Sequence, residues 1–268
     1  MSDGEPASDR EPTSVGIAAP DADVTGIADA VVAAGGVVAA GPEEPLTTDA
    51  MVAVGDAGLR ECVDASVDGP VLPIDVDGIA SLPREAPPSV IERFLADGYP
   101  VHEQPVMAVE TPAVGGRALR DVALVTATPA TISEFAIAVE ADAPDGDRST
   151  AAAVESDGPA AGGSSLARFR ADGVVVATPV GSRGYARAAG GPVVVAGSDA
   201  AAVVPIAPFA TDPDHWVVPL SEVALTVERD DADVELFVDG RSLGSVAPGT
   251  TVAIVRDGTL RLASPSRA

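Results

Sequence analysis

The sequence contains no lysine and no asparagine, and only one glutamine, one cysteine and a few aromatic residues: five Phe, two Tyr and one Trp. Because Cys62 is the single cysteine, an internal disulfide and a cysteine-based zinc site are excluded. A Walker-type phosphate loop is excluded as well, since that loop needs a lysine. The core must therefore be built from Ala, Val, Leu and Ile.

Long uncharged stretches and a recognisable targeting segment are also missing. The longest uncharged run, 242–255, has 14 residues, whereas a membrane helix needs about 18–20. The first five residues, MSDGE, have neither the basic nor the apolar region of a signal peptide. We therefore expect a cytoplasmic protein without membrane segments.

Acidic residues far outnumber basic ones, with 41 Asp and Glu against 16 Arg, which gives a net charge of −25. This charge should repel nucleic acid phosphates, so we expect neither DNA nor RNA as a partner. It also destabilises a compact chain unless salt screens it. An acidic, lysine-free, Ala- and Val-rich composition resembles that of salt-in halophilic archaea. The alternative is a nuclear or acidic-tail protein of an ordinary cell, although here the acidic residues are dispersed.

The first part of the chain alternates short apolar segments with helical patterns, after a polar segment, 1–13, that we expect to be disordered. The expected strands are 14–18, 37–40, 50–54 and 71–75, and the expected helices are 22–34, a short helix ending at Cys62, and 88–97. This alternation predicts that 14–103 forms an α/β domain with a Rossmann-like parallel sheet.

From residue 104 onward the pattern changes to Val- and Ile-rich segments separated by Gly, Pro and Asp. The expected strands are 105–110, 118–128, 132–140, 166–171, 173–179, 193–196, 217–219, 223–228, 233–238 and 251–255. The pattern predicts a predominantly β domain over 104–255, with a mobile loop at 141–165. Residues 256–268 form a C-terminal segment that we expect to return to the first domain.

Residues 166–194, LARFRADGVVVATPVGSRGYARAAGGPVV, resemble the most recognisable stretch of NAD kinases, DG-x-x-x-STPTGSTAY-x-x-SAGGP. The matching positions are Asp172-Gly173, Thr178-Pro179, Gly181-Ser182, Tyr185 and Ala189-Gly190-Gly191-Pro192. Residues 54–58 (VGDAG) resemble the family's GGDGT, 204–208 its PI-x-P turn, and 238–240 its late DG. The resemblance covers about residues 14–260 and implies the NAD kinase/diacylglycerol kinase-like superfamily fold.

The resemblance implies phosphorylation of the adenosine ribose 2′-hydroxyl of NAD, with ATP as donor and a divalent metal, expected to be Mg²⁺, but no prosthetic group. Asp56 matches the catalytic aspartate, and Gly55, Ala57 and Gly58 match the backbone that approaches the phosphates. The resemblance also implies a homo-oligomer, a dimer or tetramer. From the residues alone, Asp56 could equally be an ordinary turn or N-cap aspartate.

The NAD-binding positions implied by the resemblance are Asp172, Tyr185, Arg120, Asp121, Arg183, Gly184 and Ala188. Asp172 matches the residue that accepts a hydrogen bond from the nicotinamide carboxamide, and Tyr185 matches the pocket tyrosine. The alternative is that Tyr185 is a buried aromatic residue of the β domain with no role in binding.

Several of these positions depart from the family pattern. Arg120-Asp121 replaces its Asn-Glu pair, and Val180, Arg183 and Ala188 replace residues with hydrogen-bonding side chains. We hypothesise that Arg183 and Arg120 contact phosphate, the alternative being that each pairs with a carboxylate. Ala57 replaces a glycine, and a positive φ there would cost about 1 kcal/mol, so we expect a changed turn.

These departures leave two further functions open. One is a non-catalytic nucleotide-binding paralogue with a regulatory role, and the other is a lipid kinase of the same superfamily.

We predict that folding requires high ionic strength, because 41 carboxylates face 16 cations. The midpoint of thermal unfolding should rise steadily between low and molar KCl. A midpoint that does not change across the salt series would contradict the halophilic interpretation.

Overall fold

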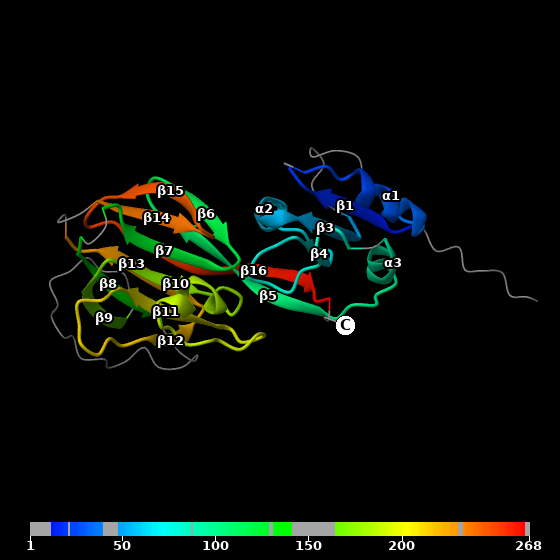
Figure 1. Cartoon of the computed structure of the whole chain (residues 1–268). Helices are drawn as coiled ribbons and strands as arrows, with labels where there is room; N and C mark the ends of the chain where they lie inside the picture. The colour runs from blue at the N-terminus through cyan, green and yellow to red at the C-terminus, as the bar shows by residue number, and fades with distance from the viewer. Residues whose placement is uncertain are drawn as a thin grey trace, which may run out of the picture. The chain divides into compact units, whose positions relative to one another are not determined.

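The computed structural model describes residues 12–20, 22–39, 48–86, 88–128, 131–140, 164–229 and 233–265. The chain divides into two compact units (Figure 1): unit 1 is Met1–Glu103 with Leu260–Ala268, and unit 2 is Gln104–Thr259. Most of the tail predicted at 1–13 and of the loop predicted at 141–165 lies outside the described residues.

Unit 1 contains a parallel sheet in the order β2-β1-β3-β4. Its strands are β1 (Ser14–Ala18), β2 (Val37–Val38), β3 (Ala50–Val54) and β4 (Val71–Ile74), and its helices are α1 (Thr25–Ala33), α2 (Gly55–Asp64) and α3 (Ser89–Leu95). Because β1 lies between β2 and β3, the chain winds outward from β1 in both directions. The predicted parallel α/β layer is confirmed, and β2 is shorter than predicted.

The core of unit 1 is aliphatic, as the composition requires. Val52 and Val54 of β3 and Leu72 of β4 pack with side chains of α1 and α3, such as Val31 and Phe94. Alternate side chains of a strand point to opposite faces, so Met51 and Ala53 lie on the other face of the sheet. α2 packs against β1 and β3.

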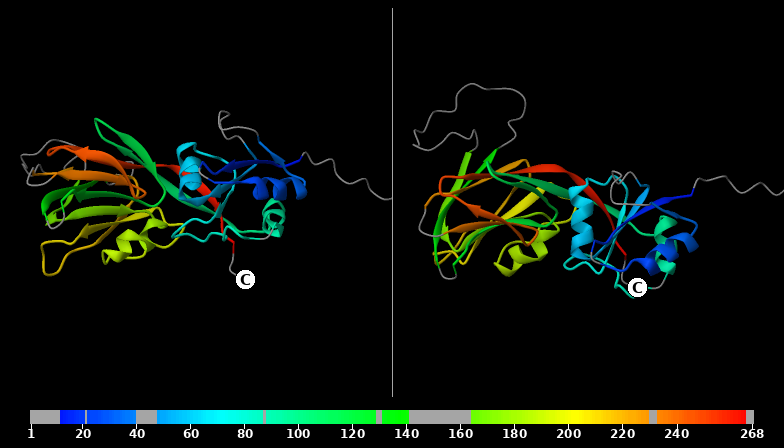
Figure 2. Two further views of the ribbon diagram at one scale, coloured as in Figure 1. Left: turned by 45° about the horizontal axis from the view of Figure 1, so that its top comes forward. Right: turned by 90° about the horizontal axis from the view of Figure 1, so that it is seen from above.

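Unit 2 contains two antiparallel sheets (Figure 2). One has the order β12-β11-β10-β7-β14-β15: β12 (Trp216–Pro219), β11 (Ala200–Ile206), β10 (Gly173–Ala177), β7 (Asp121–Thr126), β14 (Val234–Val238) and β15 (Arg241–Val246). The other runs β16-β13-β8-β9, with β16 (Thr251–Ala263), β13 (Glu222–Val227), β8 (Ser133–Glu140) and β9 (Ser164–Ala171). β5 (Val101–Glu110) pairs with β16 and with β6 (Gly115–Ala118).

Inward-facing residues of both sheets share one core. Leu124 of β7 and Val176 of β10 belong to the same cluster as Phe135 of β8 and Leu225 of β13. The predicted β-rich second domain is therefore confirmed.

The strand predicted at 193–196 is wrong. This segment follows the short helix α4 (Tyr185–Ala188) as a loop, and the Ser182 hydroxyl accepts a hydrogen bond from the Val194 N–H at 3.0 Å. Strands β6 and β15 were not predicted, because neither has an alternating apolar pattern. Strand β11 (Ala200–Ile206) was missed as well, since its last residues were interpreted as part of the PI-x-P turn. β16 continues to Ala263, beyond the predicted end at residue 255.

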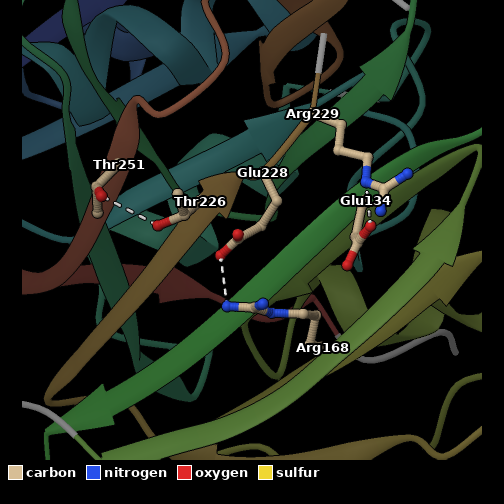
Figure 3. Close-up of polar contacts among 6 residues, drawn as sticks. All are labelled: Glu134, Arg168, Thr226, Glu228, Arg229 and Thr251. Atoms are coloured by element: carbon tan, nitrogen blue, oxygen red, sulfur yellow. Dashed lines mark hydrogen bonds and ion pairs between the residues drawn. The ribbon is translucent and has the colours of Figure 1, made fainter. Parts of the chain in front are cut away.

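Exposed arginines of unit 2 pair with carboxylates (Figure 3). Arg168 Nη2 lies 3.1 Å from Glu228 Oε1, and Arg229 Nε lies 2.7 Å from Glu134 Oε2. Pairs of this kind contribute about 0–1 kcal/mol each and are screened by salt. The fold therefore depends on its aliphatic cores rather than on these pairs. None of the described helices has the length and hydropathy needed to span a bilayer.

Helix α2 meets β1 at Gly58, where a Cβ atom would overlap the carbonyl oxygen of Ala18. We expect Gly58→Ala to lower the free energy of unfolding by about 1–3 kcal/mol, because the helix would have to move away from the sheet. Gly26→Ala in α1 is the matched control, since a Cβ there meets nothing within 4 Å. It should be neutral or stabilising by up to about 1 kcal/mol. Urea unfolding at molar KCl measures both, and equal midpoints for Gly58→Ala and wild type would contradict the close approach.

Candidate functional site

The predicted site residues lie in two places. Asp56, Gly55, Ala57 and Gly58 are at the junction of β3 and α2 in unit 1. The seven predicted NAD-binding residues are in unit 2, at the start of β7, before β10, and around α4: Arg120, Asp121, Asp172, Arg183, Gly184, Tyr185 and Ala188.

In unit 1, α2 begins directly after β3. Gly55 has φ +69°, and Asp56 lies in the first helical turn, where a negative charge is favourable. The N-cap residue Val54 makes no side-chain capping hydrogen bond. N–H groups in the first turn of a helix attract anions, so this junction suits a phosphate group.

The positive φ that would be costly at Ala57 does not occur. Ala57 lies inside α2 and is not among the residues with positive φ, so the left-handed conformation falls on Gly55 instead. Gly58 is buried and has no room for a side chain. Its close contact with Ala18 is therefore sufficient reason for a glycine at this position, without a role in phosphate binding.

A cavity of about 260 Å³ opens at the carboxyl ends of β3 and β4. Its lining is mainly aliphatic and comprises Asp23, Gly26, Ile27, Ala30, Val54, Ile74, Arg84, Ala86, Pro88, Val90 and Ile91. Asp23 accepts hydrogen bonds from the Thr25 N–H at 3.0 Å and hydroxyl at 2.7 Å, which lower the pKa of its carboxyl. Arg84 pairs with Asp75 at 3.3 Å. Both charged groups thus have partners, and Asp56 is not part of the lining.

In unit 2, the turn at Leu119–Asp121 is held by the side chain of Asp239. Its carboxylate accepts hydrogen bonds from the N–H groups of Leu119 at 2.9 Å, Arg120 at 2.8 Å and Asp121 at 3.0 Å. The Asp239 N–H donates in return to the carbonyl of Asp121 at 2.9 Å. Asp239 and Gly240 have φ values of +47° and +76°, as in a two-residue type I′ hairpin turn between β14 and β15.

The segment after β10 is attached to the same turn. The Thr178 hydroxyl donates to the carbonyl of Leu119 at 2.6 Å, and the Thr178 N–H donates to that of Arg120 at 2.9 Å. A Cβ atom at Gly181 would overlap the carbonyl oxygen of Arg120. Only glycine allows this approach, which fixes where the helical turn at Gly181–Arg183 and the following α4 begin.

Three predicted residues interact electrostatically. The pKa of Asp121 is raised to about 6 by burial and, to a smaller extent, by the charge of Asp239, while the charge of Arg120 opposes the shift. Burial also raises the pKa of Tyr185, as do the charges of Asp121 and Asp172. Asp121 and Asp172, which lie at opposite ends of the β7–β10 pair, therefore both act electrostatically on Tyr185. Tyr185 is 44% exposed, which excludes the alternative that it is a buried core aromatic.

The raised pKa of Asp121 has a consequence for stability. Protonated Asp121 fits the folded chain better than the ionised form. The stabilisation that the protonated carboxyl contributes is fully present below pH 3.8, the ordinary pKa of an aspartate, and is lost as the pH rises through the raised pKa of about 6. A shift of this size corresponds to about 3 kcal/mol. At neutral pH the protein therefore keeps an ionised carboxylate here at a cost in stability.

The two arginines of the predicted site, Arg183 and Arg120, differ in their surroundings. Arg183 is exposed and forms no ion pair with any residue that the structure describes, unlike Arg168 and Arg229. Arg120 lies close enough to Asp121 to lower its pKa. Gly184 and Ala188 are exposed beside Tyr185.

Sequence reasoning missed a role for Asp239 and for Thr178. Both lie in dipeptides that resemble family motifs, Asp239-Gly240 and Thr178-Pro179, and these dipeptides were the available signal. Within the described ranges, no group of three or more His, Cys, Asp or Glu side chains is arranged to hold a metal ion.

Comparisons with known proteins agree with this geometry. The family model for the ATP-NAD kinase C-terminal domain matches residues 119–259. The NAD kinase of Methanosarcina mazei is 37% identical over 83 residues, which are 31% of this chain and only 29% of that protein. The NAD kinase of Thermococcus gammatolerans is 28% identical over 223 residues, 80% of this chain and 72% of that protein.

A solved structure extends the comparison to the fold. An NAD kinase from Archaeoglobus fulgidus, crystallised in complex with ATP, superposes with a TM-score of 0.66 at 23% identity. The match covers 94% of this chain and 93% of that one. The predicted superfamily fold is confirmed. The family model spans just over half of the chain and includes the Leu119–Asp121 turn, Tyr185 and Asp239. The chain belongs to the NAD kinase family.

Proposed function

We propose that this protein phosphorylates the 2′-hydroxyl of the adenosine ribose of NAD, with ATP as donor, to give NADP. The observation that carries the proposal is that Asp121 and Asp172 both act on the exposed Tyr185 inside the region that the family model matches.

In unit 2 these three residues offer complementary groups to a dinucleotide. Ionised Asp121 accepts hydrogen bonds from ribose hydroxyls, and Asp172 accepts one from the nicotinamide carboxamide. The exposed ring of Tyr185 offers a flat surface on which a base can stack. Gly184 and Ala188 leave room for the ligand beside Tyr185.

In unit 1 the β3–α2 junction is suited to bind phosphate. The N–H groups at Gly55, Asp56 and Ala57 stand at the positive end of the α2 dipole and bind phosphate oxygens. Asp56 acts as the base that takes the proton from the 2′-hydroxyl as this oxygen attacks the γ-phosphorus of ATP, and the bond from this phosphorus to the bridging oxygen breaks to release ADP. Such transfer needs little beyond positioning, charge neutralisation and a base.

The divalent metal enters this proposal together with ATP. The described residues offer no three-ligand site, and Mg²⁺ is usually held by substrate phosphates and one or two carboxylates. We therefore treat MgATP as the co-substrate, and the metal supplies neutralisation of the phosphate charge.

A second candidate is a nucleotide-binding protein without catalysis. One observation favours it: of the GGDGT-like residues, Val54 is buried in β3 and Gly58 is explained by packing. Gly55 and Asp56 are then the residues left for phosphate chemistry. The lipid kinase alternative is weaker, because the matching family model is that of ATP-NAD kinase.

A homo-oligomer and a cytoplasmic location remain part of the proposal. The absence of a nucleic acid partner also stays a prediction from charge.

We expect the purified full-length chain to form NADP from NAD and MgATP in molar KCl, and Asp56→Asn to lower turnover at least about 100-fold. NAD affinity should stay within a few fold, because the substitution removes the base and not the pocket. Asp64→Asn, at the exposed other end of α2, is the matched control and should keep full activity.

The measurements are NADP formation and NAD binding by calorimetry. Full activity of Asp56→Asn would contradict the assigned base. NAD binding without any turnover in the wild type would favour the second candidate.

We expect Arg183→Ala to weaken binding of ATP or NAD about 10- to 100-fold, because an arginine without a carboxylate partner is available for phosphate. Arg168→Ala removes the same charge from a paired, exposed arginine and serves as control. Dissociation constants should be compared at one high salt concentration. Equal affinities of the Arg183 variant and wild type for NAD, NADP and ATP would rule out the phosphate contact.

A further inference from the structure

Asp239 has no part in the reaction proposed above, yet its carboxylate accepts three consecutive backbone N–H groups, those of Leu119, Arg120 and Asp121. The contact joins segments about 120 residues apart in the chain. Hydrogen bonds to a charged acceptor are about twice as strong as neutral ones, so this contact strongly restricts the turn.

We propose that Asp239 is a positioning residue that holds the Leu119–Asp121 turn, and through it Asp121 and the segment at Thr178–Gly181, in the arrangement that binds the nucleotide. Its effect on NAD binding rests on the function proposed above. Its effect on the turn does not.

The geometry leaves little freedom at either end of this contact. Asp239 is held with φ +47° at the tip of the β14–β15 hairpin, and its own N–H donates to the carbonyl of Asp121. Backbone and side chain of Asp239 thus both bind the same turn. Because Asp121 begins β7, a shift of the turn would move its carboxylate relative to Tyr185.

A second segment depends on the same turn. Thr178 donates both its hydroxyl and its N–H to carbonyl groups of Leu119 and Arg120, and Gly181 lies directly against the Arg120 carbonyl. Movement of the turn would therefore also displace the start of the segment that carries Arg183 and Tyr185.

The charge of Asp239 gives the role a signature that a simple hairpin residue lacks. The groups that face Asp121 are Asp239 from the hairpin, Arg120 from its own turn and Tyr185 from α4, with Asp172 also near Tyr185. Asp239 raises the pKa of Asp121 and Arg120 lowers it. Removing the charge of Asp239 should therefore lower the pKa of Asp121.

The test is Asp239→Asn in the full-length protein at molar KCl. The asparagine keeps the shape and tolerates positive φ, but it places an NH₂ group against a backbone N–H and removes the charge. Carboxyl ¹³C NMR of the free protein should show Asp121 titrating at a lower pH than in wild type. Hydrogen exchange at the amides of Leu119–Asp121 should become at least about 10-fold faster.

NAD titrations over a pH series give the third measurement. In wild type, affinity should fall as the pH drops through about 6, where Asp121 gains its proton. In Asp239→Asn, NAD should bind about 10-fold more weakly at neutral pH, and the fall should move to lower pH.

Two variants serve as controls. Gly240→Ala strains the same hairpin turn, where φ is +76°, but leaves the carboxylate in place. It should lower the Tm and leave the titration of Asp121 unchanged. Asp199→Asn removes one negative charge from an exposed residue paired with Arg256 and should also leave Asp121 unchanged.

An unchanged Asp121 titration together with unchanged amide exchange in Asp239→Asn would overturn the proposal. If that variant does not fold, Asp239→Ser replaces it, and fast exchange of the three amides in wild type would overturn the proposal by itself. A wild-type protein that does not bind NAD counts against the proposed function only, because titration and exchange are measured without ligand.

Discussion

The arrangement of the unit 2 site depends on direct contact between two backbone segments. Gly181 lies against the carbonyl of Arg120 with no side chain between them, and Thr178 bonds the same turn through its hydroxyl and its N–H. The two segments cannot approach in this way with any larger residue at position 181, since even the Cβ atom of an alanine would overlap the Arg120 carbonyl. Asp239 then fixes the turn from its other side. Side chains can depart from the family pattern around such a scaffold without moving it.

This scaffold has an electrostatic cost in a chain of charge −25. Burial, and next to it the like charge of Asp239 on the adjoining segment, raise the pKa of Asp121 to about 6. Arg120 partly offsets the repulsion, which gives a physical reason for an arginine beside this carboxylate. Functional groups with shifted pKa values commonly occupy sites of this type, where ligand binding repays the loss of stability.

Much of the fold was predictable because its signals are local. The strands β1, β3 and β4 and the three helices of unit 1 follow from short apolar segments that alternate with helical patterns, and from turn residues between them. β15 was not predictable, since Arg241–Val246 becomes a strand through the Asp239-Gly240 turn and pairing with β14. The segment 193–196 has a strand-like composition, yet it is a loop, because Ser182 binds the Val194 N–H that a neighbouring strand would need.

The sequence by itself determined the family resemblance, the aliphatic core and the identity of Asp56, Asp121, Asp172 and Tyr185 as candidates, because motifs and composition are properties of the chain. Only the tertiary structure decided which of them meet. It placed Asp121 and Asp172 at opposite ends of the β7–β10 pair, where both act on Tyr185. It also assigned the positive φ to Gly55 rather than Ala57, and gave Asp239 three N–H partners about 120 residues away. Hydrogen bonds and charge interactions depend on distances in space, and these are fixed only when both units have folded around their cores.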